Sequence, residues 1–243
     1  MYLLEVPLIH LVCLLLSLKS NQFKEIRMTT QVEQLWIKNP LDVLAEEDAG
    51  GGIVISGDTI KELVPSGAKP KTNFDRTFDA SNNVVLPGLI NTHHHFYQTL
   101  TRSAPSALDK ALFPWLKSLY PIWSKLMPED IRISTKLSIA ELLLSGCTTT
   151  SDHHYVFPEG LEDALEIQYE EVLASGIRAT ITRGSMCLGE EDGGLPPQTV
   201  IQSEDEIIRS SESAIARFHD ASPGAMVQVA LAPCSPFSVT EAM

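Results

Sequence analysis

Short apolar runs separated by turn residues occupy the chain between residues 28 and 86. The run QLWIK (34–38) alternates polar and apolar positions, IVIS (53–56) is almost wholly apolar, and TIKELV (59–64) alternates again after Gly57-Asp58. Alternation with a period of two is typical of half-buried strands, and a glycine–aspartate pair between two such runs favours a hairpin. We therefore expect a small β-rich module over residues 28–86.

From Pro87 onward, apolar runs alternate with longer amphipathic segments. Strand-like runs lie at 89–92, 148–152, 178–182 and 227–232, and segments with helical spacing lie between them at 129–145, 159–175 and 203–219. Strands that alternate with helices of this length indicate parallel βαβ units. Four such strands fit either the first half of a closed eight-stranded (β/α)8 barrel or an open four-stranded sheet.

The composition is that of a globular protein with an acidic balance. Of the 243 residues, 44% are hydrophobic and 20% are charged, which excludes collagen-like and wholly disordered classes. The net charge of −13 repels phosphate backbones and anionic lipid surfaces, so nucleic acid and membranes are disfavoured as partners. The cysteines are scattered and no Asn-x-Ser/Thr site is present, which favours a reducing, cytoplasmic setting.

The first 27 residues differ from the rest because they contain the apolar run MYLLEVPLIHLVCLLLSL. The run has no preceding positive charge, Pro7 and His10 interrupt it, and it is short for a membrane span. A weak membrane anchor, an export signal and an extension unrelated to the fold are the three interpretations. We favour the extension, because Met28 opens a segment typical of the start of a soluble protein.

A histidine pair after the strand-like run at 89–92 carries the clearest chemical signal. His93 and His95 are two residues apart, so on a strand both imidazoles point to one face, which is a spacing suited to metal ligands, while His94 points away. The alternative is a surface histidine cluster. Catalytic zinc usually takes three protein ligands, and no spacing marks the third among the further candidates, which are Asp152, His153, His154 and His219.

Gln98 and an aromatic stretch are candidates for binding a flat ring. The carboxamide of Gln98 could pair with the amide-like edge of a heterocycle, although an exposed helix glutamine is the alternative. Four aromatic residues could stack on such a ring or pack in the core: Phe113, Trp115, Tyr120 and Trp123. No P-loop, no GxSxG elbow and no cytidine-deaminase zinc signature occurs in the sequence.

The segment PGLINTHHH (87–95) resembles the amidohydrolase superfamily, whose first barrel strand ends in His-x-His. The similarity extends over about residues 30–243 to the members that act on heteroaromatic rings, through HHHFYQTLTR (93–102), LFPWLKSLYPIW (112–123), AELLLSGCTTTSDHHYVFPEG (140–160), RGSMCLGEEDGGLPP (183–197) and ALAPCSPFSV (230–239). The resemblance implies a (β/α)8 barrel with a small β-sandwich. Its implied division is an N-terminal extension over 1–27, part of the sandwich over 28–86 and the first half of the barrel over 87–243.

The resemblance also implies a chemistry. His93 and His95 would be ligands of one zinc ion, and Gln98 would contact the purine edge of the substrate. The implied reaction is hydrolytic deamination of an amino-substituted ring, with an 8-oxoguanine-like purine as lead substrate and guanine or a hydroxylated triazine as alternatives. The remaining ligands and the general base are expected beyond Met243. We therefore expect this chain to be inactive by itself. A half-barrel could instead pair with a second copy as a homo-oligomer, or with a separate C-terminal half. A non-catalytic truncated product is the alternative that is not an enzyme.

Overall fold

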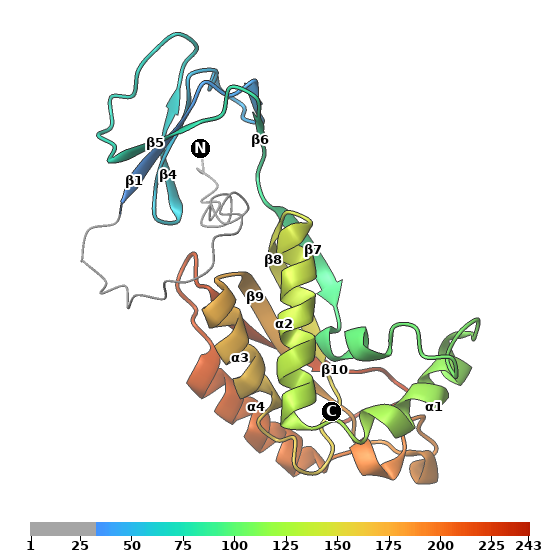
Figure 1. Ribbon diagram of the computed structural model, residues 1–243. Helices are drawn as coiled ribbons and strands as arrows, with labels where there is room; N and C mark the ends of the chain where they lie inside the picture. Colours follow the sequence, from blue (N-terminus) through green and yellow to red (C-terminus); the bar gives the residue numbers. More distant parts are fainter. Residues whose placement is uncertain (1–32) are drawn as a thin grey trace. The chain divides into compact units, whose positions relative to one another are not determined.

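The computed structural model describes residues 33–243. The expectations for residues 1–27 and for a start at Met28 lie outside this range. The chain forms two compact units, the first ending at Leu89 and the second running from Ile90 to Met243. Figure 1 follows both units along the sequence. None of the helices between residues 33 and 243 combines the length and apolar character needed to cross a bilayer.

The first unit is built around a four-stranded sheet. Its strand order is β4-β3-β1-β5, with β1 antiparallel to β3 and parallel to β5. A separate pair of two-residue strands, β2 and β6, is parallel. The strands are β1 (Gln34–Lys38), β2 (Asp42–Val43), β3 (Gly52–Ser56), β4 (Thr59–Val64), β5 (Arg76–Asp79) and β6 (Val84–Val85).

Local sequence accounts for the centre of this sheet. Strands β3 and β4 pair as the expected antiparallel hairpin, with Ser56 opposite Thr59 across the Gly57-Asp58 turn. Ile37, Ile53 and Ile55 are buried in its core, because alternate positions of a strand point to the same face. The expected β-rich module is thus observed, and its assignment to a β-sandwich stays a prediction.

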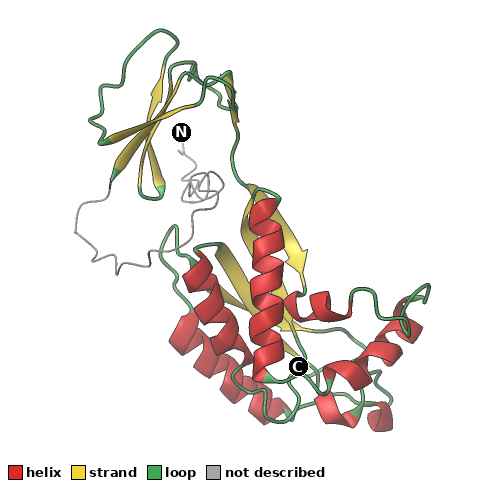
Figure 2. Ribbon diagram, viewed as in Figure 1, coloured by secondary structure: helices red, strands yellow, loops and turns green. Residues whose placement is uncertain are grey.

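The second unit places helices against a sheet of order β10-β9-β8-β7. Both β8 and β10 run parallel to β9, as the βαβ pattern predicts. Helix α2 packs on β8, α3 on β9 and α4 on β10, and Figure 2 shows these helices beside the strands. The elements are β7 (Leu89–His94), η2 (Phe96–Thr101), α1 (Leu112–Trp123), α2 (Pro128–Leu144), β8 (Cys147–His154), α3 (Ala164–Ser175), β9 (Arg178–Ser185), α4 (Glu204–Phe218) and β10 (Val227–Pro233).

Helix boundaries follow the start and stop residues in the sequence. Pro128 opens α2, where the Asp130 carboxylate accepts the amide of Met127 at 2.9 Å. Ser203 caps α4 by accepting the amide of Glu206, and Gly176 ends α3 in the left-handed region at φ 72°. Helix α3 begins five residues later than the expected 159, because the chain after Pro158 first forms turns.

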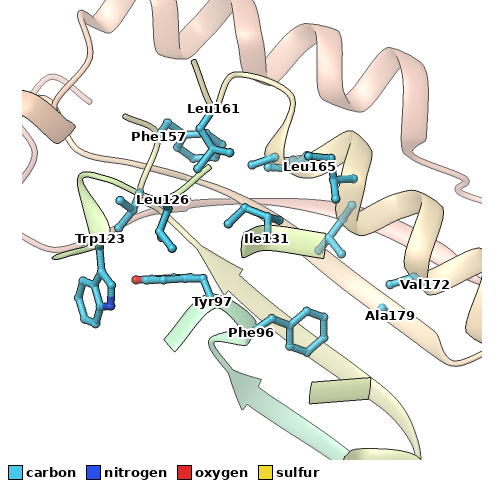
Figure 3. Close-up of a cluster of buried hydrophobic side chains, with 14 of the residues drawn as sticks. Phe96, Tyr97, Trp123, Leu126, Ile131, Phe157, Leu161, Leu165, Val172 and Ala179 are labelled. Atoms are coloured by element: carbon cyan, nitrogen blue, oxygen red, sulfur yellow. The ribbon is translucent and has the colours of Figure 1, made fainter. Parts of the chain in front are cut away.

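The aromatic stretch forms helix α1, which the sequence pattern did not predict. Trp123 and Tyr120 are buried in the main hydrophobic core, so core packing is the observed role of this pair. Figure 3 shows Trp123 and Tyr97 in this core, together with Phe96 and Ile131. Phe113 lies outside it, exposed at 44% and in edge contact with the ring of Phe237.

Candidate metal centre

The end of strand β7 brings two imidazoles together. The Nε2 atoms of His93 and His95 lie 3.1 Å apart, and their rings meet edge to face with centroids 4.9 Å apart. His94, on the opposite side of the strand, packs against the ring of Phe96 instead. The two-residue spacing thus produces the pairing that strand geometry predicts.

His95 is held in the tautomer that a metal requires. Its Nδ1 lies 2.7 Å from the carbonyl oxygen of His153 and donates to it, because a carbonyl can only accept. The lone pair of the neutral ring is therefore on Nε2, which faces His93. Burial lowers the pKa of His95 to about 4, although the bond to His153 opposes this shift. The imidazole is thus neutral at pH 7 and able to coordinate.

His93 is exposed and is supported by its neighbours. Its ring stacks on the ring of His153 with centroids 4.7 Å apart and planes 20° apart. Its backbone amide donates to the side-chain oxygen of Asn91 at 2.9 Å. His153 therefore contacts both members of the pair, through its ring on one side and its carbonyl on the other.

The Nε2 atoms of His93 and His95 are spaced as two nitrogen ligands of one zinc ion would be. Zinc–nitrogen bonds of 2.0–2.1 Å in a tetrahedral arrangement separate two ligand nitrogens by about 3.3 Å, close to the 3.1 Å observed. Among the residues from 33 to 243, no group of three or more His, Cys, Asp and Glu side chains is arranged to hold a metal. The structure therefore brings together His93 and His95 and adds no third ligand from the described residues.

Asp152, His154 and His219 do not join the histidine pair in a metal-binding group of the described residues. Asp152 is fully buried, and its carboxylate oxygens accept the backbone amide of Phe96 at 2.6 Å and the side-chain amide of Gln168 at 2.5 Å. Burial raises the pKa of Asp152 to about 7 against these two hydrogen bonds, which lower it. The ring of His154 is enclosed by the rings of Tyr97 and Phe157. His219 follows α4, where its Nδ1 accepts the amide of Val229.

Gln98 lies on η2 beside the histidine pair. Its Nε2 donates to the hydroxyl oxygens of Tyr97 at 3.2 Å and Tyr155 at 3.3 Å. The Tyr155 ring meets the ring of His95 edge to face, with centroids 5.5 Å apart. Burial raises the pKa of the Tyr155 hydroxyl above its usual value, so both tyrosines are neutral hydrogen-bonding groups at pH 7.

Sequence patterns did not indicate the two tyrosines or the role of Asp152. Tyr155 follows the end of β8, which is where α/β sites form, so its position was the available signal. The contact between Asp152 and Phe96 joins residues 56 positions apart. No local pattern predicts a contact over that distance.

Comparison with known proteins identifies a family and related sequences. The model of the Amidohydrolase family matches residues 84–243. The 8-oxoguanine deaminase of Pseudomonas aeruginosa is 54% identical over 211 residues, which are 86% of this chain and 47% of that protein. A hydroxydechloroatrazine ethylaminohydrolase of Pseudomonas sp. is 33% identical over 82% of this chain and 42% of its own length.

Solved structures show the same fold. The atrazine chlorohydrolase TrzN of Arthrobacter aurescens TC1, complexed with zinc, matches with a TM-score of 0.74 and 26% identity, over 85% of this chain and 48% of that one. The chain thus spans less than half the length of each of these three proteins.

Proposed function

The chain belongs to the amidohydrolase family, and from this membership we propose that it carries part of the active site of a zinc-dependent deaminase. The proposed substrate is an amino-substituted purine of the 8-oxoguanine kind. The observation that carries the proposal is the 3.1 Å convergence of His93 Nε2 and His95 Nε2 at the end of β7. The 54% identity to an 8-oxoguanine deaminase supports the choice of substrate.

His93 and His95 would hold the zinc ion, each through Nε2. A bound zinc ion supplies hydroxide at neutral pH, because it lowers the pKa of water to about 7. The carbonyl of His153 keeps the lone pair of His95 on Nε2, and the stacked His153 ring supports His93. In the overall reaction, water replaces the amino group on a ring carbon and ammonia is released. We assign proton transfer to none of the described residues.

Gln98 would orient the heterocycle. Because its Nε2 is engaged by two tyrosine hydroxyls, its carboxamide oxygen is the group left to accept a hydrogen bond from a ring N–H or amino group. An 8-oxoguanine-like purine offers such donors. The contact of Tyr155 with both Gln98 and His95 sets this carboxamide beside the metal centre.

The second unit would form the first half of a (β/α)8 barrel. In the described residues, β7 and β10 are the outer strands of the sheet. Ile90 on β7 is 69% exposed and Leu231 on β10 is 54% exposed. Apolar side chains on outer strands are expected where a barrel continues on both sides. The first unit would correspondingly be part of the small β-sandwich.

A chimera tests the proposed function in a complete protein. The 211 aligned residues of the P. aeruginosa 8-oxoguanine deaminase are replaced by those of this chain. Ammonia release is measured with 8-oxoguanine, and ethylamine release is measured with hydroxyatrazine, whose amino nitrogens carry alkyl groups. We expect turnover of 8-oxoguanine, and a loss of at least 1,000-fold when His93→Ala and His95→Ala are combined in the chimera, because zinc supplies the nucleophile.

The controls separate the alternatives. A folded, zinc-containing chimera that releases ethylamine from hydroxyatrazine but no ammonia from 8-oxoguanine would replace the purine with a triazine, the substrate class of the relative at 33% identity. Full activity in the double variant would contradict the metal assignment. The chain assayed by itself tests the prediction that it is inactive alone.

A further inference from the structure

We propose that Asp152 is a positioning residue of the metal centre, which fixes the backbone after His95 and thereby the direction of the His95 imidazole. The inference rests on the proposed assignment of His93 and His95 as ligands. It gives Asp152 a role distinct from coordination, and it follows from contacts at the end of strand β8.

The carboxylate of Asp152 joins two segments that are distant in sequence. Oδ1 accepts the amide of Phe96, which is the first residue of η2, and Oδ2 accepts Nε2 of Gln168 on α3. The side chain is 0% exposed, so no water competes for these donors. Hydrogen bonds to a buried carboxylate are short and strong, and the observed lengths are 2.6 and 2.5 Å.

The position of Phe96 makes this contact relevant to the metal centre. Phe96 directly follows His95, and its own ring is fully buried. His95 precedes η2 in an extended conformation, at φ −131° and ψ 93°, and its side chain provides no cap. The acceptor for the first amide of η2 therefore comes from Asp152, which fixes the turn through which the chain leaves His95.

Adjacent residues of β8 thus hold His95 at two points. The carbonyl of His153 accepts Nδ1 of the imidazole, and the carboxylate of Asp152 accepts the next backbone amide. Without the carboxylate, the Phe96 amide would be buried with no acceptor, and the chain would have to rotate to satisfy it. Such a rotation would move His95 Nε2 away from His93.

Strand geometry explains why Asp152 supports the metal centre through the backbone and is not itself a metal ligand. Neighbouring residues on a strand point to opposite faces. His153 faces the histidine pair, on whose His93 ring it stacks, while Asp152 faces α3 through Gln168. Each carboxylate oxygen accepts an N–H donor from the protein, and no acidic side chain among residues 33–243 joins the histidine pair in a metal-binding group.

Zinc affinity of the whole chain tests the inference. The dissociation constant is measured by competition with a chromophoric chelator for the wild type, Asp152→Leu and Asp152→Asn. We expect Asp152→Leu, which is similar in size but accepts no hydrogen bond, to bind zinc at least 10-fold more weakly. Asp152→Asn retains an acceptor for the Phe96 amide and is expected to stay within about threefold of the wild type.

A matched control distinguishes positioning from general destabilisation. Glu171→Leu removes another buried carboxylate of the same unit, one that pairs with Arg132 away from the histidines. It is expected to lower stability and to leave zinc affinity unchanged. The visible spectrum of the Co²⁺-loaded protein gives a second readout, because it depends on ligand geometry, and it should change in Asp152→Leu only.

The outcomes separate this inference from the proposed function. Unchanged zinc affinity and an unchanged cobalt spectrum in Asp152→Leu, or an equal loss in Glu171→Leu, would overturn the positioning role and leave the metal centre standing. If wild-type zinc binding did not depend on His93 and His95, the metal centre itself would fail, and this inference with it. If Asp152→Leu does not fold, Asp152→Glu replaces it, since one added methylene displaces the oxygens, and unchanged affinity there would equally overturn the role.

Discussion

The imidazole of His154 is fully buried at the end of β8, between the rings of Tyr97 and Phe157. Burial, reinforced by the nearby charge of Arg183, lowers its pKa to about 3. The guanidinium of Arg183 is also buried and stacks on the Phe157 ring, 3.9 Å from its centroid. In the folded protein, His154 therefore stays neutral at pH values at which the same side chain is protonated in the unfolded chain.

This difference predicts a loss of stability in acid. The unfolded pKa of histidine is about 6.5, so the stabilising effect of a neutral His154 is fully present above that value. It is lost as the pH falls toward the folded value of about 3. When the pH is lowered from 7 to 5, the wild type should lose about 2 kcal/mol more of its unfolding free energy than His154→Phe does, because phenylalanine takes up no proton on unfolding. Urea unfolding at both pH values measures this, and parallel losses in the two proteins would contradict the burial argument.

At the residue scale, the sequence predicts what depends on local spacing. The two-residue separation of His93 and His95 is sufficient to predict that their side chains meet on one face of a strand. The sequence does not indicate where the side chains of Asp152 and His154 lie, because both residues come at the end of a strand-like run and either could have joined the histidine pair. Their burial against α3 and the aromatic core depends on tertiary packing, which no spacing rule supplies.

At the element scale, the pairing of β1 with β3 depends on a glycine. Gly52 pairs with Lys38 and adopts φ +106°, a conformation that L-residues rarely adopt. A Cβ at this position would collide with the backbone carbonyl of Ile37. Gly67 in the same unit also has a positive φ, +76°, but a Cβ there would meet open space.

These two glycines provide a matched prediction. Gly67→Ala is expected to destabilise the first unit by about 1 kcal/mol, from backbone strain alone. Gly52→Ala adds a backbone collision and should lower stability by at least about 2 kcal/mol more. Hydrogen exchange of the β1 and β3 amides measures the opening free energy. Equal effects of the two substitutions would contradict the collision argument, because they would show that the strands move apart at Gly52 with little cost in stability.

Element types were predictable where a strong period coincides with end signals. Helices α2 and α4 carry Pro128 and Ser203 at their starts and were expected within one or two residues of their observed bounds. Helix α1 was not predicted, because Pro121 lies inside it and its aromatic residues also suited a ligand-binding surface. Its helical form depends on packing of Trp123 and Tyr120 into the core.

At the scale of the whole molecule, the two units have different relations to the proposed function. The second unit carries the histidine pair and its supporting residues, and all of it lies within the residues that match the family. The order of its strands, with polar residues at their carboxyl ends, was predictable from the alternation of strands and helices. The further ligands that a catalytic zinc needs could not be predicted, because no described residue joins His93 and His95 as a third ligand.

Zinc binding by the wild-type chain, compared with the His93→Ala/His95→Ala double variant, tests the central claim most directly. His94→Ala is the control, because His94 sits between the two proposed ligands and packs on Phe96 instead. We expect one zinc ion per chain in the wild type and in the control, and at least 100-fold weaker binding in the double variant. Equal zinc affinity in all three proteins would contradict the assignment of His93 and His95 as the metal centre.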